Sequence, residues 1–331
     1  MTHARLGTVD PARRRAAARA VAGADLDDAA ADVAFSAAAW SALVEPGDGV
    51  GGALRRLLGP VRALEVVVAA VPDPGDVDGV RPAEVLTALA GTGHELDGPR
   101  VRAALRRWAP RATADRCVGA VRAAVHVGAR LLVPGTDAWP RALDDLADHA
   151  PAALWVRGPL ALPPARRAVS LVGARASSAY GTQVAADLAG ALGDRGRVVV
   201  SGGAYGIDGT AHRAALGTPA STVSVTAGGV DRFYPRGHDE LLRRVVDQGA
   251  LVSEVVCGTT PSRWRFLERS RLPYVALASR KPPTSWSGAF CLRLPPRAEP
   301  ALEEVAELAA GEADGGDEDE GAEEIHTLSA H

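Results

Sequence analysis

Two short apolar runs, each followed at once by a glycine-rich turn, constrain the fold of this chain most strongly. One turn begins at Gly173 and the other spans residues 202–206. Between them, residues 182–195 carry apolar side chains at helical spacing. Strand, turn, helix, strand and turn outline a βαβ unit, and ligands of such folds bind at these turns. The pattern predicts an α/β fold with an anion-binding edge.

The glycine spacing excludes two common cofactor sites. Neither turn matches G-x-G-x-x-G, typical of dinucleotide binding, or G-x-x-x-x-G-K-[ST], typical of nucleoside triphosphate binding. Cys117, Cys257 and Cys291 lack the spacing of metal ligands or of a redox pair. No apolar run reaches the ~18 residues that a membrane span needs. We therefore expect no cofactor, no metal, no membrane association and a reducing, cytoplasmic location.

The net charge of −3 hides an uneven distribution along the 331 residues. Residues 301–331 hold eleven of the 40 carboxylates and no lysine or arginine, which leaves 37 basic against 29 acidic side chains in the rest. A mildly basic body fits a nucleic-acid binder, although such a surplus is common in other proteins. The acidic segment is typical of a disordered tail, which either is inert or competes with DNA for a basic surface.

An ordered series of motifs runs through residues 131–272. The series consists of Val133-Pro-Gly, Trp139-Pro140, Leu154-Trp-Val-Arg-Gly158, Gly173-Ala-Arg175, Ser178-Ala-Tyr180-Gly181, Ser201-Gly-Gly-Ala-Tyr-Gly-Ile-Asp208, His212, Ala227-Gly-Gly-Val-Asp231, Tyr234-Pro235, His238, Ser253-Glu254, and Phe266 ahead of Arg269-Ser-Arg271. It resembles the DNA-processing protein A family (DprA, also called Smf). The resemblance implies a Rossmann-like domain that binds single-stranded DNA and hands it to the RecA recombinase during DNA uptake, without catalysis. We also expect a homodimer.

Composition and resemblance together predict three regions. Residues 1–130 form a helical N-terminal domain, in which the pattern around 54–64 fits either a helix-hairpin-helix or a plain helical bundle. Residues 131–300 form the Rossmann-like DNA-processing domain, with a lead-in at 131–165, a core at 166–272 and a divergent part at 273–300. Residues 301–331 form a short helix and the acidic, disordered tail.

The chain departs from the family pattern after Leu272. The family continues with an apolar strand, an Arg-Ser-Gly turn and a helix, whereas residues 273–300 contain six prolines. Proline cannot donate a ladder hydrogen bond, so this part is a poor candidate for a buried central strand. We expect the C-terminal part of the sheet to be incomplete, through divergence, an internal deletion or a frameshift.

Binding a single strand requires cations for phosphates and flat side chains for bases. Arg175 directly follows the first strand and is the principal candidate for a phosphate contact. Arg213 and Arg236 fit either DNA contacts or surface ion pairs, and aromatic residues lie close by at 180, 205, 233, 234 and 266. The candidate DNA- or phosphate-binding residues are Gly173, Arg175, Ser178, Tyr180, Gly202, Gly203, Gly206, Arg236, Phe266, Arg269 and Arg271.

Asp208 and His212 lie one helical turn apart and suggest an acid–base pair. Neither a nucleophile-elbow context nor metal-ligand spacing accompanies them, so we interpret both as structural supports of the second glycine turn. Two other functions remain open: a nucleotide-binding or nucleoside-monophosphate-cleaving Rossmann-like enzyme, and a degenerate remnant that no longer binds. The enzyme would need a Pro-Gly-Gly-x-Gly-Thr turn, which the sequence lacks.

Overall fold

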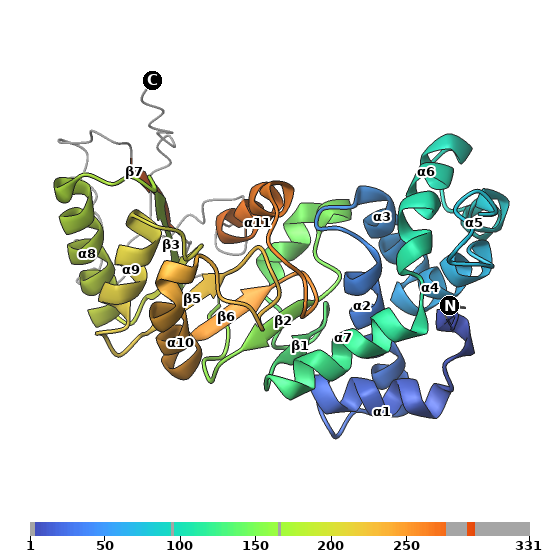
Figure 1. The fold of residues 1–331 in the computed structure, drawn as a ribbon, viewed down its shortest axis with the longest axis horizontal. Coiled ribbons are helices and arrows are strands. Elements are labelled where there is room, and N and C mark those ends of the chain that lie inside the picture. Colours follow the sequence, from blue (N-terminus) through green and yellow to red (C-terminus); the bar gives the residue numbers. More distant parts are fainter. Residues whose placement is uncertain (1–3, 94–95, 165–166, 276–289, 295–331) are drawn as a thin grey trace, which may run out of the picture. The chain divides into compact units, whose positions relative to one another are not determined.

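The computed structural model describes residues 4–93, 96–164, 167–275 and 290–294 (Figure 1). The chain divides into two compact units. The first comprises Met1–Gly158, Thr226–Phe233 and Val252–Arg269, and the second Pro159–Val225, Tyr234–Leu251 and Ser270–His331. Strand β6 (Ala250–Ser253) and helix α11 (Arg263–Val275) each contribute residues to both units. Within the described residues, no helix has the length and apolar character required to cross a bilayer.

The first unit is mainly helical, as the sequence pattern indicates. Aspartates at 10, 27, 48 and 97, and Thr113, accept hydrogen bonds from backbone N–H groups at the starts of five helices, which fixes where those helices begin. Two short strands, β1 (Arg130–Leu132) and β2 (Leu154–Arg157), pair antiparallel. The helices are α1 (Pro11–Ala22), α2 (Asp28–Leu43), α3 (Gly49–Leu58), α4 (Pro60–Ala70), α5 (Pro82–Leu89), α6 (Gly98–Trp108) and α7 (Ala114–His126).

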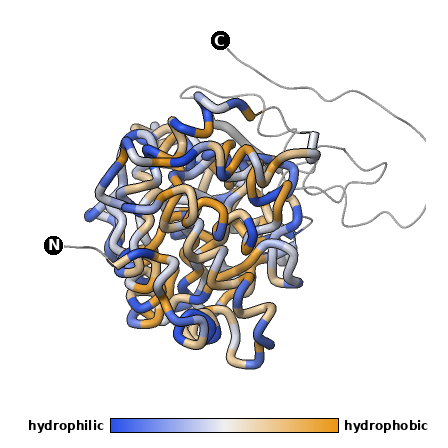
Figure 2. Tube along the Cα trace, turned by 90° about the vertical axis from the view of Figure 1, so that its right-hand side faces the viewer, coloured by the Kyte–Doolittle hydropathy of each residue, from blue (hydrophilic) through white to orange (hydrophobic). Residues whose placement is uncertain are grey.

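The core of the first unit is built around α2. This helix is buried on nearly all sides, and its Trp40 ring meets Trp108 edge-on at 5.7 Å between centroids. The Trp155 indole N–H donates to Ser41 Oγ at 3.1 Å, so β2 is also fastened to α2. Apolar positions, orange in Figure 2, concentrate inside the fold.

The start of α3 is filled by the chain's own side chains. Asp48 accepts hydrogen bonds from the Gly51 backbone N–H at 3.1 Å and from the Trp108 indole at 3.0 Å, and it pairs with Arg107. A side chain at Gly52 would overlap the backbone carbonyl of Asp148. A carboxylate of the chain itself therefore occupies the positive end of the α3 helix dipole.

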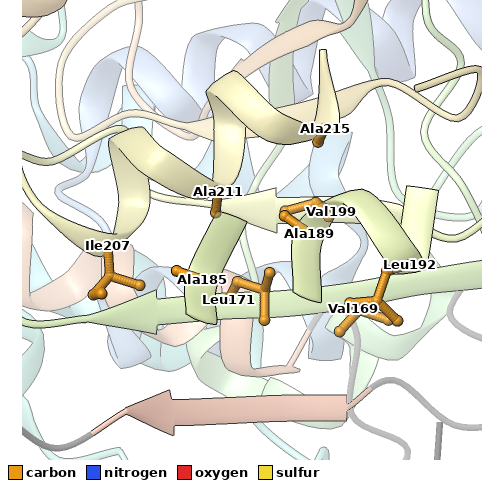
Figure 3. Packing of buried hydrophobic residues seen from close by; sticks show 9 residues of the cluster. All are labelled: Val169, Leu171, Ala185, Ala189, Leu192, Val199, Ile207, Ala211 and Ala215. Atoms are coloured by element: carbon orange, nitrogen blue, oxygen red, sulfur yellow. The ribbon is translucent and has the colours of Figure 1, made fainter. Parts of the chain in front are cut away.

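The second unit contains the predicted α/β core. Strands β3 (Ala168–Gly173), β4 (Val198–Ser201) and β5 (Thr222–Val225) pair in parallel, with Val169 opposite Val199 and Val200 opposite Val223. The connecting helices are α8 (Ala179–Asp194), α9 (Ile207–Ala215) and α10 (Asp239–Gln248). Figure 3 shows α8 and α9 packed on β3 and β4 through small alanines facing Val169, Leu171 and Val199. The Rossmann-like α/β class is confirmed.

The expectation that the sheet stays incomplete beyond Leu272 is wrong for one segment. Residues Phe290–Leu294 form β7, which pairs in parallel with β3, with Ser170 opposite Cys291. β7 is the last strand in the order, so only one of its two sides pairs with another strand. An edge strand of this kind tolerates prolines nearby in the sequence, because the backbone N–H groups on its outer side form no ladder hydrogen bonds. Helix α11 contains Pro273, whose carbonyl accepts from Ser170 Oγ at 2.7 Å. Residues 276–289 and 295–331, with the predicted acidic tail, lie outside the described residues.

Candidate nucleic-acid interface

Most of the predicted site residues of the second unit lie at one edge of the parallel sheet. β3, β4 and β5 are neighbours in the sheet and run in the same direction, so the loops that follow them start at the same edge. These loops are residues 174–178, residues 202–206 and, within the second unit, residues 234–238. The carboxyl edge of such a sheet is where ligands of open α/β folds bind.

An exposed tyrosine lies within or directly after each of the three loops. Tyr180, Tyr205 and Tyr234 expose 46%, 48% and 48% of their surface, and they are three of the four tyrosines in the chain. Tyr180 lies in the first turn of α8, while Tyr205 and Tyr234 lie in the loops themselves. Unpaired bases stack on exposed aromatic rings of this kind.

The two glycine turns are in direct contact. Gly206 has a φ of +76°, and a side chain there would overlap the carbonyl oxygens of Ala174 and Arg175. The Ile207 backbone N–H donates to the Ala174 carbonyl at 3.2 Å. Only glycine satisfies both the backbone conformation and the close approach. The second turn thereby fixes the loop that carries Arg175.

Tyr205 is held in place by the loop after β5. Its hydroxyl accepts from the Gly237 backbone N–H at 3.3 Å, and its ring packs edge-on against His238 at 4.9 Å. The buried His238 faces the Gly203 carbonyl through Nδ1 at 3.1 Å, so this nitrogen carries the proton and donates. His238 is a positioning residue that the site prediction omitted, although it belongs to the motif series in the sequence.

The arginines of the second unit differ in how they are presented. Arg175 and Arg236 are exposed in the first and third loops. Among the residues that the structure describes, Arg236 and the exposed Arg213 of α9 form no ion pair, so the alternative of surface ion pairing finds no support there. Arg271 is half-buried on α11. Arg175 and Arg236 are thus the exposed arginines of these loops.

Two of the predicted site residues, Phe266 and Arg269, belong to the first unit and not to the unit that carries the three loops. Arg269 is only 8% exposed, and its guanidinium lies over the Phe266 ring at 5.8 Å. A buried cation stacked on a ring of its own helix is poorly placed for a phosphate. Phe233, also in this unit, lies in the same way under Arg157 at 5.8 Å.

The other predicted residues shape the turns. Ser178 caps α8 by accepting from the Gly181 backbone N–H at 3.1 Å. Gly202 and Gly203 are buried, and a side chain at Gly173 would meet Ile207 at 2.7 Å. Asp208 accepts from the Ala204 backbone N–H at 3.3 Å, which ties the second turn to α9 as predicted. His212 faces Thr222 Oγ1 at 2.9 Å, which fastens α9 to β5.

Two hydroxyl groups of β4 and β5 hold neighbouring strands of the sheet together. Ser201 Oγ donates to the Leu171 carbonyl at 2.6 Å, and Thr222 Oγ1 donates to the Val199 carbonyl at 2.6 Å. Thr222 Oγ1 thus accepts from His212, which places the imidazole proton on Nδ1. Among the residues that the structure describes, no three histidine, cysteine, aspartate or glutamate side chains are grouped so that they could hold a metal ion. The arrangement suits binding by arginine side chains and aromatic rings.

Comparison with known proteins agrees with the motif series. The family described as DNA recombination-mediator protein A matches residues 130–280. The putative DNA processing protein DprA of Mycobacterium tuberculosis (strain CDC 1551 / Oshkosh) is 46% identical over 169 residues, which cover 48% of this chain and 43% of that protein. DNA processing protein DprA of Bacillus subtilis (strain 168) is 37% identical over 122 residues, 37% of this chain and 41% of the relative. The matches thus span less than half of these relatives.

A solved structure supports the fold. DNA processing protein A from Streptococcus pneumoniae superposes with a TM-score of 0.54 at 18% identity, covering 85% of this chain and 92% of that chain. At this identity the likeness shows the fold alone. The sequence match, the ordered motifs and the fold agree: residues 130–280 of this chain match the DNA recombination-mediator protein A (DprA/Smf) family.

Proposed function

We propose that the chain binds single-stranded DNA at the carboxyl edge of β3, β4 and β5. The observation that carries this proposal is the set of three half-exposed tyrosines, one after each of three neighbouring strands, with exposed Arg175 and Arg236 in the loops that follow β3 and β5. Arginine holds phosphates through charge-assisted hydrogen bonds, and tyrosine stacks on any base. In a duplex the bases stack on each other, so this surface favours single strands of any sequence.

The role that follows is binding rather than catalysis. We propose that the chain protects incoming single strands and helps to load the RecA recombinase on them during DNA uptake, as a cytoplasmic homodimer. The family description as a recombination mediator supports this role. The Ser201 hydroxyl at the end of β4 is engaged with the Leu171 carbonyl, which favours binding over a nucleotide-cleaving enzyme that would use it as an activated nucleophile.

Arg175→Ala tests the predicted phosphate contact. Because Arg175 is exposed at the end of β3, removing its guanidinium should leave the fold intact and weaken single-strand binding by ~1–3 kcal/mol. Fluorescence anisotropy with a labelled oligothymidylate measures the affinity, and thermal unfolding measures the stability. The slope of log affinity against log salt should also become shallower by about 0.7, the value for one phosphate contact on a single strand.

The matched control is Arg195→Ala, at an exposed arginine just beyond the opposite end of α8. It removes the same charge from the same unit and should leave binding almost unchanged. Equal losses in both variants would mean that only net charge matters, and they would refute the specific role of Arg175.

A further inference from the structure

Trp264 differs from every other tryptophan that the structure describes. Trp40, Trp108, Trp139 and Trp155 are between 0% and 3% exposed, whereas Trp264 is 57% exposed on the first turn of α11. Leu267, one turn further along the helix, is 63% exposed. A large aromatic side chain held in water is typical of a binding surface.

The helical turn that carries Trp264 is firmly anchored in the first unit. The neighbouring Arg265 donates through Nε and Nη2 to both oxygens of Glu45, at 2.9 and 2.8 Å, and through Nη1 to the Thr260 carbonyl at 2.8 Å. Arg111 pairs with the same carboxylate at 2.6 Å. Trp264 is therefore presented to solvent by a fixed turn rather than by a fraying end.

The Glu45 anchor is ionised under ordinary conditions. Partial burial raises the pKa of Glu45, but the hydrogen bonds and charges of Arg265 and Arg111 outweigh this effect and hold the pKa below its usual value. The carboxylate thus keeps both guanidinium partners at neutral pH and loses them only as the pH falls below the ordinary glutamate range.

The charge next to Trp264 is positive. Residues 263–271 contain four arginines and one glutamate. Arg265 binds Glu45, and Arg269 is buried over Phe266. Arg263 is exposed beside Trp264 and forms no ion pair among the described residues. An exposed indole next to an uncompensated guanidinium matches a base and its adjacent phosphate.

We propose that Trp264 and Arg263 form a second single-stranded DNA contact, located in the first unit. Trp264 stacks on one base, and Arg263 contacts a phosphate of the same strand. The inference rests on the proposed function, because it takes the same ligand, but it assigns binding to residues outside the glycine-turn loops. The positive charge favours DNA over a purely apolar protein partner, which would use Leu267 as much as Trp264.

The test compares a full-length oligothymidylate with an abasic strand of equal length, using the full chain and anisotropy. Trp264→Ala should weaken oligothymidylate binding between about fivefold and a hundredfold and leave abasic binding unchanged, because the lost contact is base stacking. Trp264→Phe should retain most of the affinity. Leu267→Ala, the matched loss of an apolar side chain on the same exposed face, should leave both affinities unchanged.

Several outcomes overturn the proposal. Unchanged oligothymidylate binding in Trp264→Ala does so, as does an equal loss on the abasic strand, which would indicate a change in structure. A shift in oligomeric state with both Trp264→Ala and Leu267→Ala, without a loss of DNA affinity, would identify a protein-docking face instead. If the unaltered chain binds no single strand, the proposed function itself fails. If Trp264→Ala does not fold, the affinities of Trp264→Phe for the oligothymidylate and for the abasic strand test the proposal instead.

Discussion

Replacing Tyr180, Tyr205 and Tyr234 together by alanine is expected to lower single-strand affinity by at least about a hundredfold. Stacking of a base on an aromatic side chain contributes ~1–3 kcal/mol, and the three rings follow three neighbouring strands of one sheet edge. Each ring is about half exposed, so its removal opens no cavity in the core. Anisotropy titrations of the triple variant measure the loss.

The matched control replaces the same three tyrosines by phenylalanine. This variant keeps the rings and removes only the hydroxyls, including the one that accepts from the Gly237 N–H. It should retain affinity within about tenfold, because stacking depends on the ring and one neutral hydrogen bond contributes only ~1 kcal/mol. If both triple variants bind like the unaltered chain, the three tyrosines are not the DNA-binding site.

Gly206→Ala is expected to destabilise the second unit by about 2–4 kcal/mol, the largest effect on stability that we predict. The substitution puts a side chain on a backbone with φ +76° and ψ −127° and drives it into the carbonyl oxygens of Ala174 and Arg175. Thermal unfolding followed by circular dichroism measures the change. Because the displaced carbonyls belong to the loop of Arg175, single-strand affinity should fall as well.

Gly190→Ala provides the control for this change. Gly190 lies inside α8 with no neighbouring atom within 4 Å of an added side chain, so alanine should be neutral or stabilise the helix by up to ~1 kcal/mol. The close contact between the two turns would be refuted if Gly206→Ala unfolded at the same temperature as Gly190→Ala.

The parallel core could be predicted from the sequence because its strands are short apolar runs that end in glycine turns. The two apolar runs that precede the turns at Gly173 and at 202–206 form β3 and β4, and the helical spacing at 182–195 coincides with most of α8. Helix α2 gave no comparable signal. It is buried on nearly all sides and rich in alanine, so its sequence lacks the polar face from which an amphipathic helix is recognised.

The burial and contacts of individual side chains were harder to predict than the helices and strands that carry them. Arg269 and Arg236 look alike in the sequence, but Arg269 is buried over Phe266 while Arg236 is exposed. His212 reaches β5 because helix α9 packs across the sheet, which local spacing does not encode. Strand β7 was missed because a stretch rich in proline reads as a break, although an edge position tolerates it.

The most direct test of the account is the affinity of the full chain for a single strand and for a duplex of the same sequence, measured across a series of salt concentrations. The account predicts binding to the single strand that is about tenfold tighter or more, with little dependence on sequence and a steep fall with salt as counterions are released. Equal affinity for the duplex, or single-strand affinity that does not change with salt, would contradict it.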